Sequence, residues 1–240
     1  MKKILPLTLA LTSSMAIAQE GIQEYGIVGA SGTFGQSVYS TDSSANFGLT
    51  PTIFYYSNHG FIDGSLINVS VLPYLGISGN WRFSEVSDTF DSIPTGINER
   101  KGSLELGVTF GTPGARLTYL HDVSNVHQGS ELQLHLGKTF ATPLSDLSLT
   151  PFIEVDWRDK KLSNHVYGVS VAESLVSGLA EYNPSTNLVY KAGLIGLYDL
   201  SDNFVVLSKA RIERHDDESP IVQRKLGYSF ELGLTYKFAG

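Results

Sequence analysis

The chain of 240 residues contains no cysteine. Disulfide frameworks and thiolate metal sites are therefore excluded, so stability must come from hydrogen bonding and packing. Beyond the N-terminal stretch, no segment approaches the roughly 20 uninterrupted apolar residues that a membrane-spanning helix needs. Positive charge is also scarce, since 17 Lys and Arg stand against 24 Asp and Glu. This acidic balance argues against a nucleic-acid partner, because nucleic-acid binding requires clustered Lys and Arg.

Catalytic and metal-binding constellations are equally scarce. The 6 histidines are scattered without the spacing of a zinc site. His215-Asp216-Asp217-Glu218 gathers the residue types of an Asp/His protease site. Neighbours on a flexible loop point in different directions, so we interpret this stretch as a solvated acidic loop, with a weak divalent-cation contact as the alternative. We expect no cofactor, no metal and no enzymatic activity.

Residues 1–18 have the composition of a secretory signal peptide. The stretch begins with two lysines, continues without charge, and ends with the small residues of Ala16-Ile17-Ala18. We therefore expect an exported protein with a cleaved signal peptide. The remainder, residues 19–240, has a length suited to a single all-β domain.

The stretch 225–238 alternates strictly between apolar residues and polar residues or glycine. A period of two marks a β-strand with one apolar and one polar face. Similar, less regular alternation occurs in ten further segments: 25–34, 47–57, 60–71, 74–84, 101–110, 115–123, 131–140, 147–158, 189–200 and 203–213. We find no convincing amphipathic helix apart from a short helical turn near 171–178.

The connections between these segments alternate in length. Tight turns near 112–114, 141–146 and 201–203 alternate with long polar loops near 85–100, 158–187 and 214–224. Short periplasmic turns and long extracellular loops are typical of bacterial outer-membrane barrels, which have an even number of strands. The sequence thus predicts an all-β fold, a closed antiparallel transmembrane β-barrel of ten or twelve strands in the outer membrane of a Gram-negative bacterium.

The composition of the two strand faces decides between this barrel and a soluble sandwich. Gly, Ser and Thr are frequent on the polar face, as in a crowded lumen, and aromatic residues lie near both ends of 225–238, as at two membrane interfaces. The apolar face is therefore predicted to face outer-membrane lipid and lipopolysaccharide. The predicted lipid-facing residues are Leu104, Leu106, Val108, Leu132, Leu134, Leu232 and Leu234.

Charged residues of both signs fall on the opposite, lumen-facing positions of the strands. They include Glu105, Arg116, Glu131, Glu154, Arg211 and Glu231. The lumen of a barrel with ten or twelve strands is narrow. Opposite charges are then expected to pair across the lumen and plug it, and the alternative is a narrow solute channel.

Several motifs resemble those of the MipA/OmpV family of outer-membrane proteins. The family's Tyr-Gly-Val and Ser-Gly-Leu elements are matched by Tyr167-Gly168-Val169 and Ser177-Gly178-Leu179, and its Ser-Pro-Ile-Val element by Ser219-Pro220-Ile221-Val222. Its early Pro-x-x-x-Tyr and Phe-x-Asp-Gly elements are matched from Pro51 and from Phe61. The motifs keep their order over most of residues 19–240.

This resemblance implies an outer-membrane barrel without catalytic residues. It also implies a scaffold for periplasmic peptidoglycan-remodelling enzymes, namely a lytic murein transglycosylase and a peptidoglycan synthase, or a role in envelope homeostasis. Two alternatives remain open: a small porin-like channel, or an adhesin acting through the extracellular loops.

Overall fold

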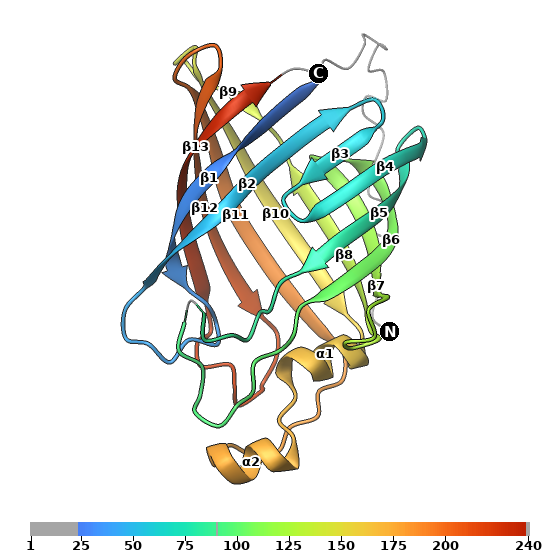
Figure 1. Cartoon of the computed structure of the whole chain (residues 1–240), viewed down its shortest axis with the longest axis vertical. Helices are drawn as coiled ribbons and strands as arrows, with labels where there is room; N and C mark the ends of the chain where they lie inside the picture. Colours follow the sequence, from blue (N-terminus) through green and yellow to red (C-terminus); the bar gives the residue numbers. More distant parts are fainter. Residues whose placement is uncertain (1–23, 90, 239–240) are drawn as a thin grey trace, which may run out of the picture.

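In the computed structural model, residues 24–89 and 91–238 are described, and within them antiparallel strands form a closed barrel (Figure 1). The predicted signal peptide lies outside these residues. The strands are β1 (Tyr25–Gln36), β2 (Asn46–Ser57), β3 (Gly60–Asp63), β4 (Leu66–Leu72), β5 (Leu75–Arg82), β6 (Ser103–Thr112), β7 (Ala115–Asp122), β8 (Ser130–Gly137), β9 (Phe140–Ala141), β10 (Leu147–Arg158), β11 (Asn187–Asp199), β12 (Phe204–His215) and β13 (Gly227–Phe238).

The barrel closes where β1, the first strand, pairs with β13, the last. Consecutive strands pair along the rest of the wall, including β10 with β11 across the long loop 159–186. The short β9 continues the line of β8 along β10, so the described wall has twelve strands. The interruption between β8 and β9 lies opposite Pro151, whose carbonyl accepts a hydrogen bond from the Lys138 N–H at 3.2 Å. A bond of 2.8 Å between the Thr139 and Thr150 hydroxyls bridges this interruption.

The segment 60–71, expected as a single strand, is a hairpin. The strands β3 and β4 are joined by Gly64-Ser65, and Gly64 adopts φ +59°, a conformation that favours glycine. The alternation breaks at this turn, where Asp63-Gly64-Ser65 is followed by two apolar residues, Leu66-Ile67. The signal that was missed is the Asp63-Gly64 pair, since Asp-Gly between alternating stretches marks a tight hairpin. This hairpin supplies the twelfth strand.

Two helices, α1 (Lys160–Tyr167) and α2 (Val171–Ser177), lie in the loop between β10 and β11 (Figure 1). The second confirms the helical turn expected near 171–178, whereas α1 was not foreseen. Asp159 begins α1 by accepting a hydrogen bond from the Leu162 N–H at 2.9 Å. No helix in the described part of the chain has the length and apolar character needed to cross a membrane.

The two ends of the barrel differ. At one end, here the terminus end, lie the start of β1, the end of β13 and the tight turns near 112–114, 141–146 and 201–203, whereas the turn at Gly64-Ser65 lies partway along the wall. At the other, the cap end, four segments fold over the lumen; we call them the cap. They are residues 37–45, 83–102 apart from position 90, 159–186 and 216–226. Short turns and long loops are thus segregated, as the alternating loop lengths indicated.

The lumen is filled in layers. Near the terminus end, inward apolar side chains pack together, with Ile27, Val205 and Leu207 buried in one cluster. In the middle, Thr109 shares hydroxyl bonds with Ser78 at 2.6 Å and Thr118 at 3.0 Å. Charged residues gather at the cap end. The lumen is therefore a packed interior over much of its length, not an open pore.

Candidate functional site: the closed end of the barrel

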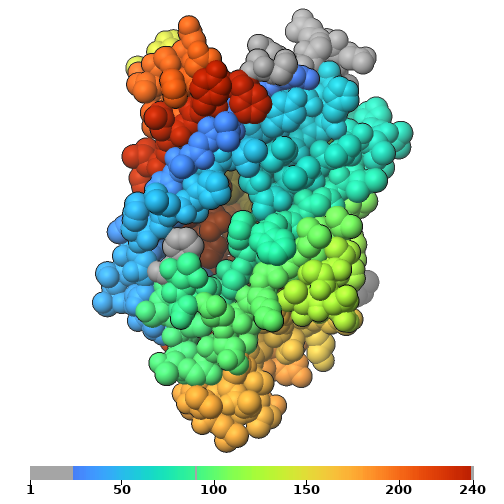
Figure 2. Space-filling model, in the orientation of Figure 1, coloured from blue at the N-terminus to red at the C-terminus, as the bar shows by residue number. Residues whose placement is uncertain are grey.

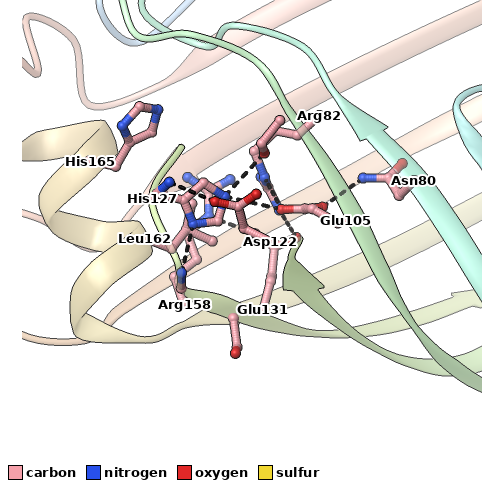
Figure 3. A network of polar contacts seen from close by, with 12 residues as sticks. Asn80, Arg82, Glu105, Asp122, His127, Glu131, Arg158, Leu162 and His165 are labelled. Carbon is pink, nitrogen blue, oxygen red and sulfur yellow. Dashed lines mark hydrogen bonds and ion pairs between the residues drawn. The ribbon is translucent and has the colours of Figure 1, made fainter. Parts of the chain in front are cut away.

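Five charged residues join the barrel wall to the cap. We call Arg82, Glu85, Glu105, Glu131 and Arg158 the ionic layer. Arg82 bonds Glu105 through Nε–Oε1 at 2.7 Å and Glu131 through Nη2–Oε1 at 2.8 Å (Figure 3). Arg158 bonds Glu131 through Nε–Oε2 at 2.8 Å. Each guanidinium therefore reaches the shared Glu131, and these pairs link β5, β6, β8 and β10 around one side of the lumen.

The layer reaches the cap through Glu85, which follows β5. Both guanidiniums contact this carboxylate, Arg82 at 2.9 Å and Arg158 at 2.9 Å. Burial would raise the pKa of Glu85, but Arg158 and Arg82 outweigh it and lower the pKa to about 2. Glu85 is thus ionised at neutral pH and fastens the loop to the wall.

A second group of ion pairs lies on the neighbouring wall. Lys191 of β11 contacts Glu154 at 2.8 Å and Asp156 at 2.7 Å, both on β10. The ring of His135 on β8 contacts Glu154 at 2.9 Å. Together with the ionic layer, these contacts pair charges around much of the lumen's circumference. Buried charges are stable only when paired in this way.

Three aromatic side chains connect the ionic layer to the cap. The Tyr167 hydroxyl accepts a hydrogen bond from Arg158 Nη1 at 3.0 Å and lies 2.7 Å from His215 Nδ1. The Tyr39 hydroxyl also lies within 3.2 Å of His215 Nδ1. His215 is the last residue of β12 and is buried, so placing it in a solvated loop was wrong. Its strand position turns the ring inward, away from the acidic residues that follow.

The apolar core of the cap contains residues of the family motifs. Tyr167, Val169 and Ile221 are buried there, and Val222 packs against them. The Ser219 hydroxyl donates to the Tyr167 carbonyl at 2.6 Å, joining two motifs that are far apart in sequence. The core also takes Val38, Tyr39, Val86, Ile97, Leu162 and Val166. The motifs therefore specify how the cap closes.

Helix α2 is attached to the cap by Glu173. Ser170 and Glu173 form a capping box, and Arg100 Nη1 donates to Glu173 Oε1 at 2.6 Å. Burial would raise the pKa of Glu173, but the bonds from Arg100 and from backbone N–H groups lower it to about 2. Gly178 ends the helix at φ +73°. Of the remaining motif residues, Ser177 closes α2 and its hydroxyl accepts from the Leu179 N–H at 3.1 Å.

Within Tyr167-Gly168-Val169, the backbone of Gly168 lies so close to the carbonyl of Asn164 that a side chain would not fit. A Cβ atom on Gly168 would lie 2.4 Å from the Asn164 carbonyl oxygen. Pro220, between Ser219 and Ile221, is half-buried and its carbonyl accepts from Gln223 Nε2 at 2.7 Å. These two positions set the path of the chain over the lumen.

The predicted lipid-facing residues lie on the outer face of the wall, where their side chains are exposed. These are Leu104, Leu106, Val108, Leu132, Leu134, Leu232 and Leu234. Of the predicted lumen-facing charges, Glu105, Glu131 and Arg116 are buried, and Arg116 pairs with Asp63 at 2.7 Å. Glu154, Arg211 and Glu231 are partly buried. The structure brings Glu105 and Glu131 together in the ionic layer but leaves Arg211 and Glu231 outside it.

Sequence reasoning missed Arg82 and Glu85. Arg82 could have been found, because it shares the inward parity of Ser78 and Asn80 on β5. Glu85 lies in a loop, where no periodicity indicates direction. In the ionic layer the acids are bound by guanidiniums, and the layer closes the lumen at the cap end. The described residues contain no group of three His, Asp or Glu placed to hold a metal ion.

An outer groove of about 680 Å³ lies beside the cap. It is lined by Arg100, Lys101, His165, Glu173 and Tyr182, among others. Burial lowers the pKa of His165, whose ring contacts the Lys101 carbonyl at 3.1 Å. The groove is open and polar, and it lies on the outer side of the cap.

A closed antiparallel barrel with an apolar outer face and an ion-paired lumen defines an integral β-barrel of the outer membrane. Residues 28–238 match the family model described as MltA-interacting protein MipA, so the chain belongs to this family. The family predicted from the sequence motifs is thereby confirmed.

Two curated relatives illustrate the match. The chain is 36% identical over 95 residues to the MltA-interacting protein of Escherichia coli K12, covering 38% of each chain. It is 32% identical over 95 residues to the putative outer membrane protein YiaT of the same organism, covering 38% of this chain and 39% of the relative. The alignments thus span well under half the length of these relatives.

Among solved structures, OmpT of Vibrio cholerae with its L8 loop deleted matches with a TM-score of 0.37 at 9% identity, over 90% of this chain and 98% of that one. Neisserial surface protein A matches with a TM-score of 0.30 at 10% identity, over 90% and 97% of the two chains.

Proposed function

We propose that the protein is a non-catalytic outer-membrane scaffold, whose surfaces, not its lumen, carry the function. The observation that supports this is the closure of the lumen. The ionic layer and the cap cover one end, and packed apolar side chains fill the other. A barrel closed in this way has little capacity for solute transport, which leaves its rims as the places where partners bind.

The family indicates the class of partner. One relative is named for its interaction with MltA. We infer that this chain likewise contacts a lytic murein transglycosylase and, as a second partner, a peptidoglycan synthase. Both would lie on the periplasmic side, where barrels of this class place their termini and short turns.

The terminus end offers a suitable surface. Four apolar side chains are exposed at or beside its tight turns: Leu72, Tyr74, Leu144 and Leu200. Exposed apolar side chains on the turns at one end of the barrel can take part in a protein interface. We therefore place the enzyme-binding surface on these turns.

The test is co-purification of the full-length barrel, in detergent, with a purified periplasmic lytic transglycosylase. Leu144→Glu and Leu200→Glu should reduce the retained enzyme at least tenfold. Leu175→Glu, which alters an equally apolar exposed residue at the cap end, is the matched control and should retain it. Equal retention by all variants, or no retention by the wild type, would reject the scaffold proposal.

One observation favours an alternative role in adhesion. Helix α2 exposes Val171, Leu175 and Val176 on the outside of the cap, with Leu175 82% exposed. Apolar side chains on an extracellular loop can bind another surface. If Leu175→Glu abolishes attachment to host cells while enzyme binding is unchanged, the adhesin role gains support. A porin-like channel is the weaker alternative, and planar-bilayer conductance tests it.

A further inference from the structure

Strand β2 has one free edge. It pairs with β1 along almost its whole length, from Asn46 to Tyr56, but with β3 only from Phe54 onward. Gly64 N–H donates to the Ile53 carbonyl at 3.0 Å, which is where pairing on this side ends. Within the described residues, no strand pairs with this edge of β2 from Asn46 to Thr52.

The sequence is adapted to this free edge. Backbone groups alternate sides along a strand, so Pro51, Leu49 and Phe47 point the same way as the Ile53 carbonyl. Pro51 therefore turns its nitrogen, which carries no hydrogen, toward the unpaired side. Proline within sheets is confined to such edges. At Pro51 the chain therefore has no backbone N–H group to leave unpaired on this edge.

The free edge bounds an opening in the barrel wall. Figure 2 shows the surface hollowed between β2 and β5, with atoms of the C-terminal strands, in dark red, visible behind. Next to this opening the outward side chains of Phe47 and Leu49 are 68% and 72% exposed. The interruption at Pro151 is bridged by the hydroxyls of Thr139 and Thr150, whereas no hydroxyl pair among residues 24–89 and 91–238 bridges this one.

Such an opening is costly next to hydrocarbon. The N–H and C=O groups of Phe47 and Leu49 and the carbonyl of Pro51 require hydrogen-bond partners, and acyl chains supply none. Outward aromatic residues in the same ladder row, Phe47, Phe34 and Phe230, indicate the depth of a membrane interface, where headgroups are present. Polar headgroups at this depth can satisfy the exposed backbone.

The lumen behind the opening is polar and carries charges of both signs. One ladder row runs from Gly48 of β2 through Thr33 to Glu231 and then Lys209, and the Thr52 hydroxyl donates to Glu231 Oε1 at 3.4 Å. The Lys209 ammonium lies over the Phe152 ring at 5.8 Å and forms no ion pair within 4 Å with a described carboxylate. The nearby Arg211 has only a 3.4 Å contact with Glu213. These two cations are less fully paired than those of the ionic layer.

We propose that the opening between the free edge of β2 and β5 is a lateral portal that receives the headgroup of an anionic membrane phospholipid. The headgroup lies in the lumen near Lys209 and Arg211 and bonds the free backbone of β2. The acyl chains remain outside, against Phe47 and Leu49. Neither the cap nor the partner-binding rim takes part, so this inference is independent of the scaffold function.

Lipid retention provides the first test. The purified barrel in detergent is mixed with phosphatidylglycerol or phosphatidylcholine, and bound lipid is counted by native mass spectrometry. The wild type and Lys209→Arg should retain phosphatidylglycerol at least tenfold better than phosphatidylcholine. Lys209→Gln should lose most of this preference. Lys138→Gln, the same charge change on the outer surface, should keep it.

The second test locates the headgroup. Because the chain has no cysteine, single cysteines report on single positions. Vesicles contain a lipid with a maleimide on its headgroup, and a small aqueous maleimide confirms that each thiol reacts. Leu49→Cys, outside the wall, and Thr50→Cys, inside it beside the portal, should both react with the lipid. Gln133→Cys, inside the wall on β8, should not.

Folding of each variant is checked by heat-modifiable migration in gels. Three results would overturn the proposal: equal retention of the two phospholipids, an unchanged preference in folded Lys209→Gln, or no reaction of folded Thr50→Cys with the lipid reagent. Equal labelling of Thr50→Cys and Gln133→Cys would also overturn it, since the reagent would then enter elsewhere.

Discussion

Arg158 of the barrel wall holds Glu85 of the cap with two parallel hydrogen bonds, Nη1–Oε2 and Nη2–Oε1, both 2.9 Å long. Such two-pronged pairs fix orientation as well as distance. The same guanidinium also binds Glu131 in the wall and the hydroxyl of Tyr167 in the cap. One side chain therefore ties the membrane-spanning barrel to the loops that close it.

Replacing this side chain should be costly. Arg158→Ala leaves Glu131 and Glu85 without a main partner, and breaking a buried pair in this way costs about 3–5 kcal/mol. We expect a lower urea midpoint for unfolding, measured by heat-modifiable migration after equilibration in lipid. Arg214→Ala, at an exposed arginine on β12, is the control and should change the midpoint little. An unchanged midpoint for Arg158→Ala would show that the ionic layer does not stabilise the barrel.

The Tyr167 hydroxyl should stabilise the cap specifically. Tyr167→Phe removes one hydrogen-bond partner from each of Arg158 and His215, with an expected cost of about 1–3 kcal/mol. Trypsin should then cut the cap faster at Lys160 and Lys161, while the barrel remains folded. Tyr190→Phe, at an exposed tyrosine of β11, should leave the cutting rate unchanged. Equal rates in the two variants would contradict this role.

Acid should release the cap. The folded-state pKa is about 2 for both Glu85 and Glu173, below the ordinary value of about 4.3. Their ionised forms therefore stabilise the closed cap above about pH 4, and this contribution is lost as the pH falls toward 2. A spin label at Leu175→Cys should become more mobile in that range.

Two comparisons make the acid experiment specific. A label at Leu144→Cys, at the terminus end, should show no transition. Adding Glu85→Gln to the Leu175→Cys protein should raise mobility already at pH 7 and shrink the step below pH 4. A transition of full size in that variant would assign the release to other groups.

The effect of proline on the stability of β2 should depend on whether the missing backbone N–H would point to the free edge or toward β1. Pro51→Val adds an N–H on the free edge and should leave unfolding within about 0.5 kcal/mol of wild type. Thr52→Pro removes an N–H that points toward β1, costing at least about 1 kcal/mol for the lost bond and more for the orphaned carbonyl in the membrane. Equal destabilisation by both changes would mean that the edge is not free.

The closed lumen should not conduct as a porin does. Purified wild-type protein in planar bilayers at neutral pH should give no steady conductance steps, with a general porin as positive control. The reason is that both the ionic layer and the apolar cluster around Ile27 and Leu207 obstruct the axis. Stable steps from the wild type would restore the channel alternative.

Much of the architecture follows from local sequence pattern. Alternation with a period of two decides which side chains of a strand share a face, so the outward position of Leu232 and the inward position of Glu231 could be read from β13 alone. The lengths of the connections also predicted that the two ends of the barrel differ, with short turns at one and long loops at the other. This too is local information, because each connection joins two strands that are neighbours in the sequence.

The closure and the opening of this barrel depend on contacts between distant segments, which periodicity does not encode. Glu85 meets Arg158 only because β5 and β10 face one lumen, and His215 turns inward only because β12 extends two residues beyond its expected end at 213. The free edge of β2 arises because β3 is four residues long, a length set by the turn at Gly64. Sequence alone therefore determined a membrane barrel and its two faces, whereas tertiary structure decided that its lumen is capped and its wall is open, because pairing partners are fixed by the closed sheet.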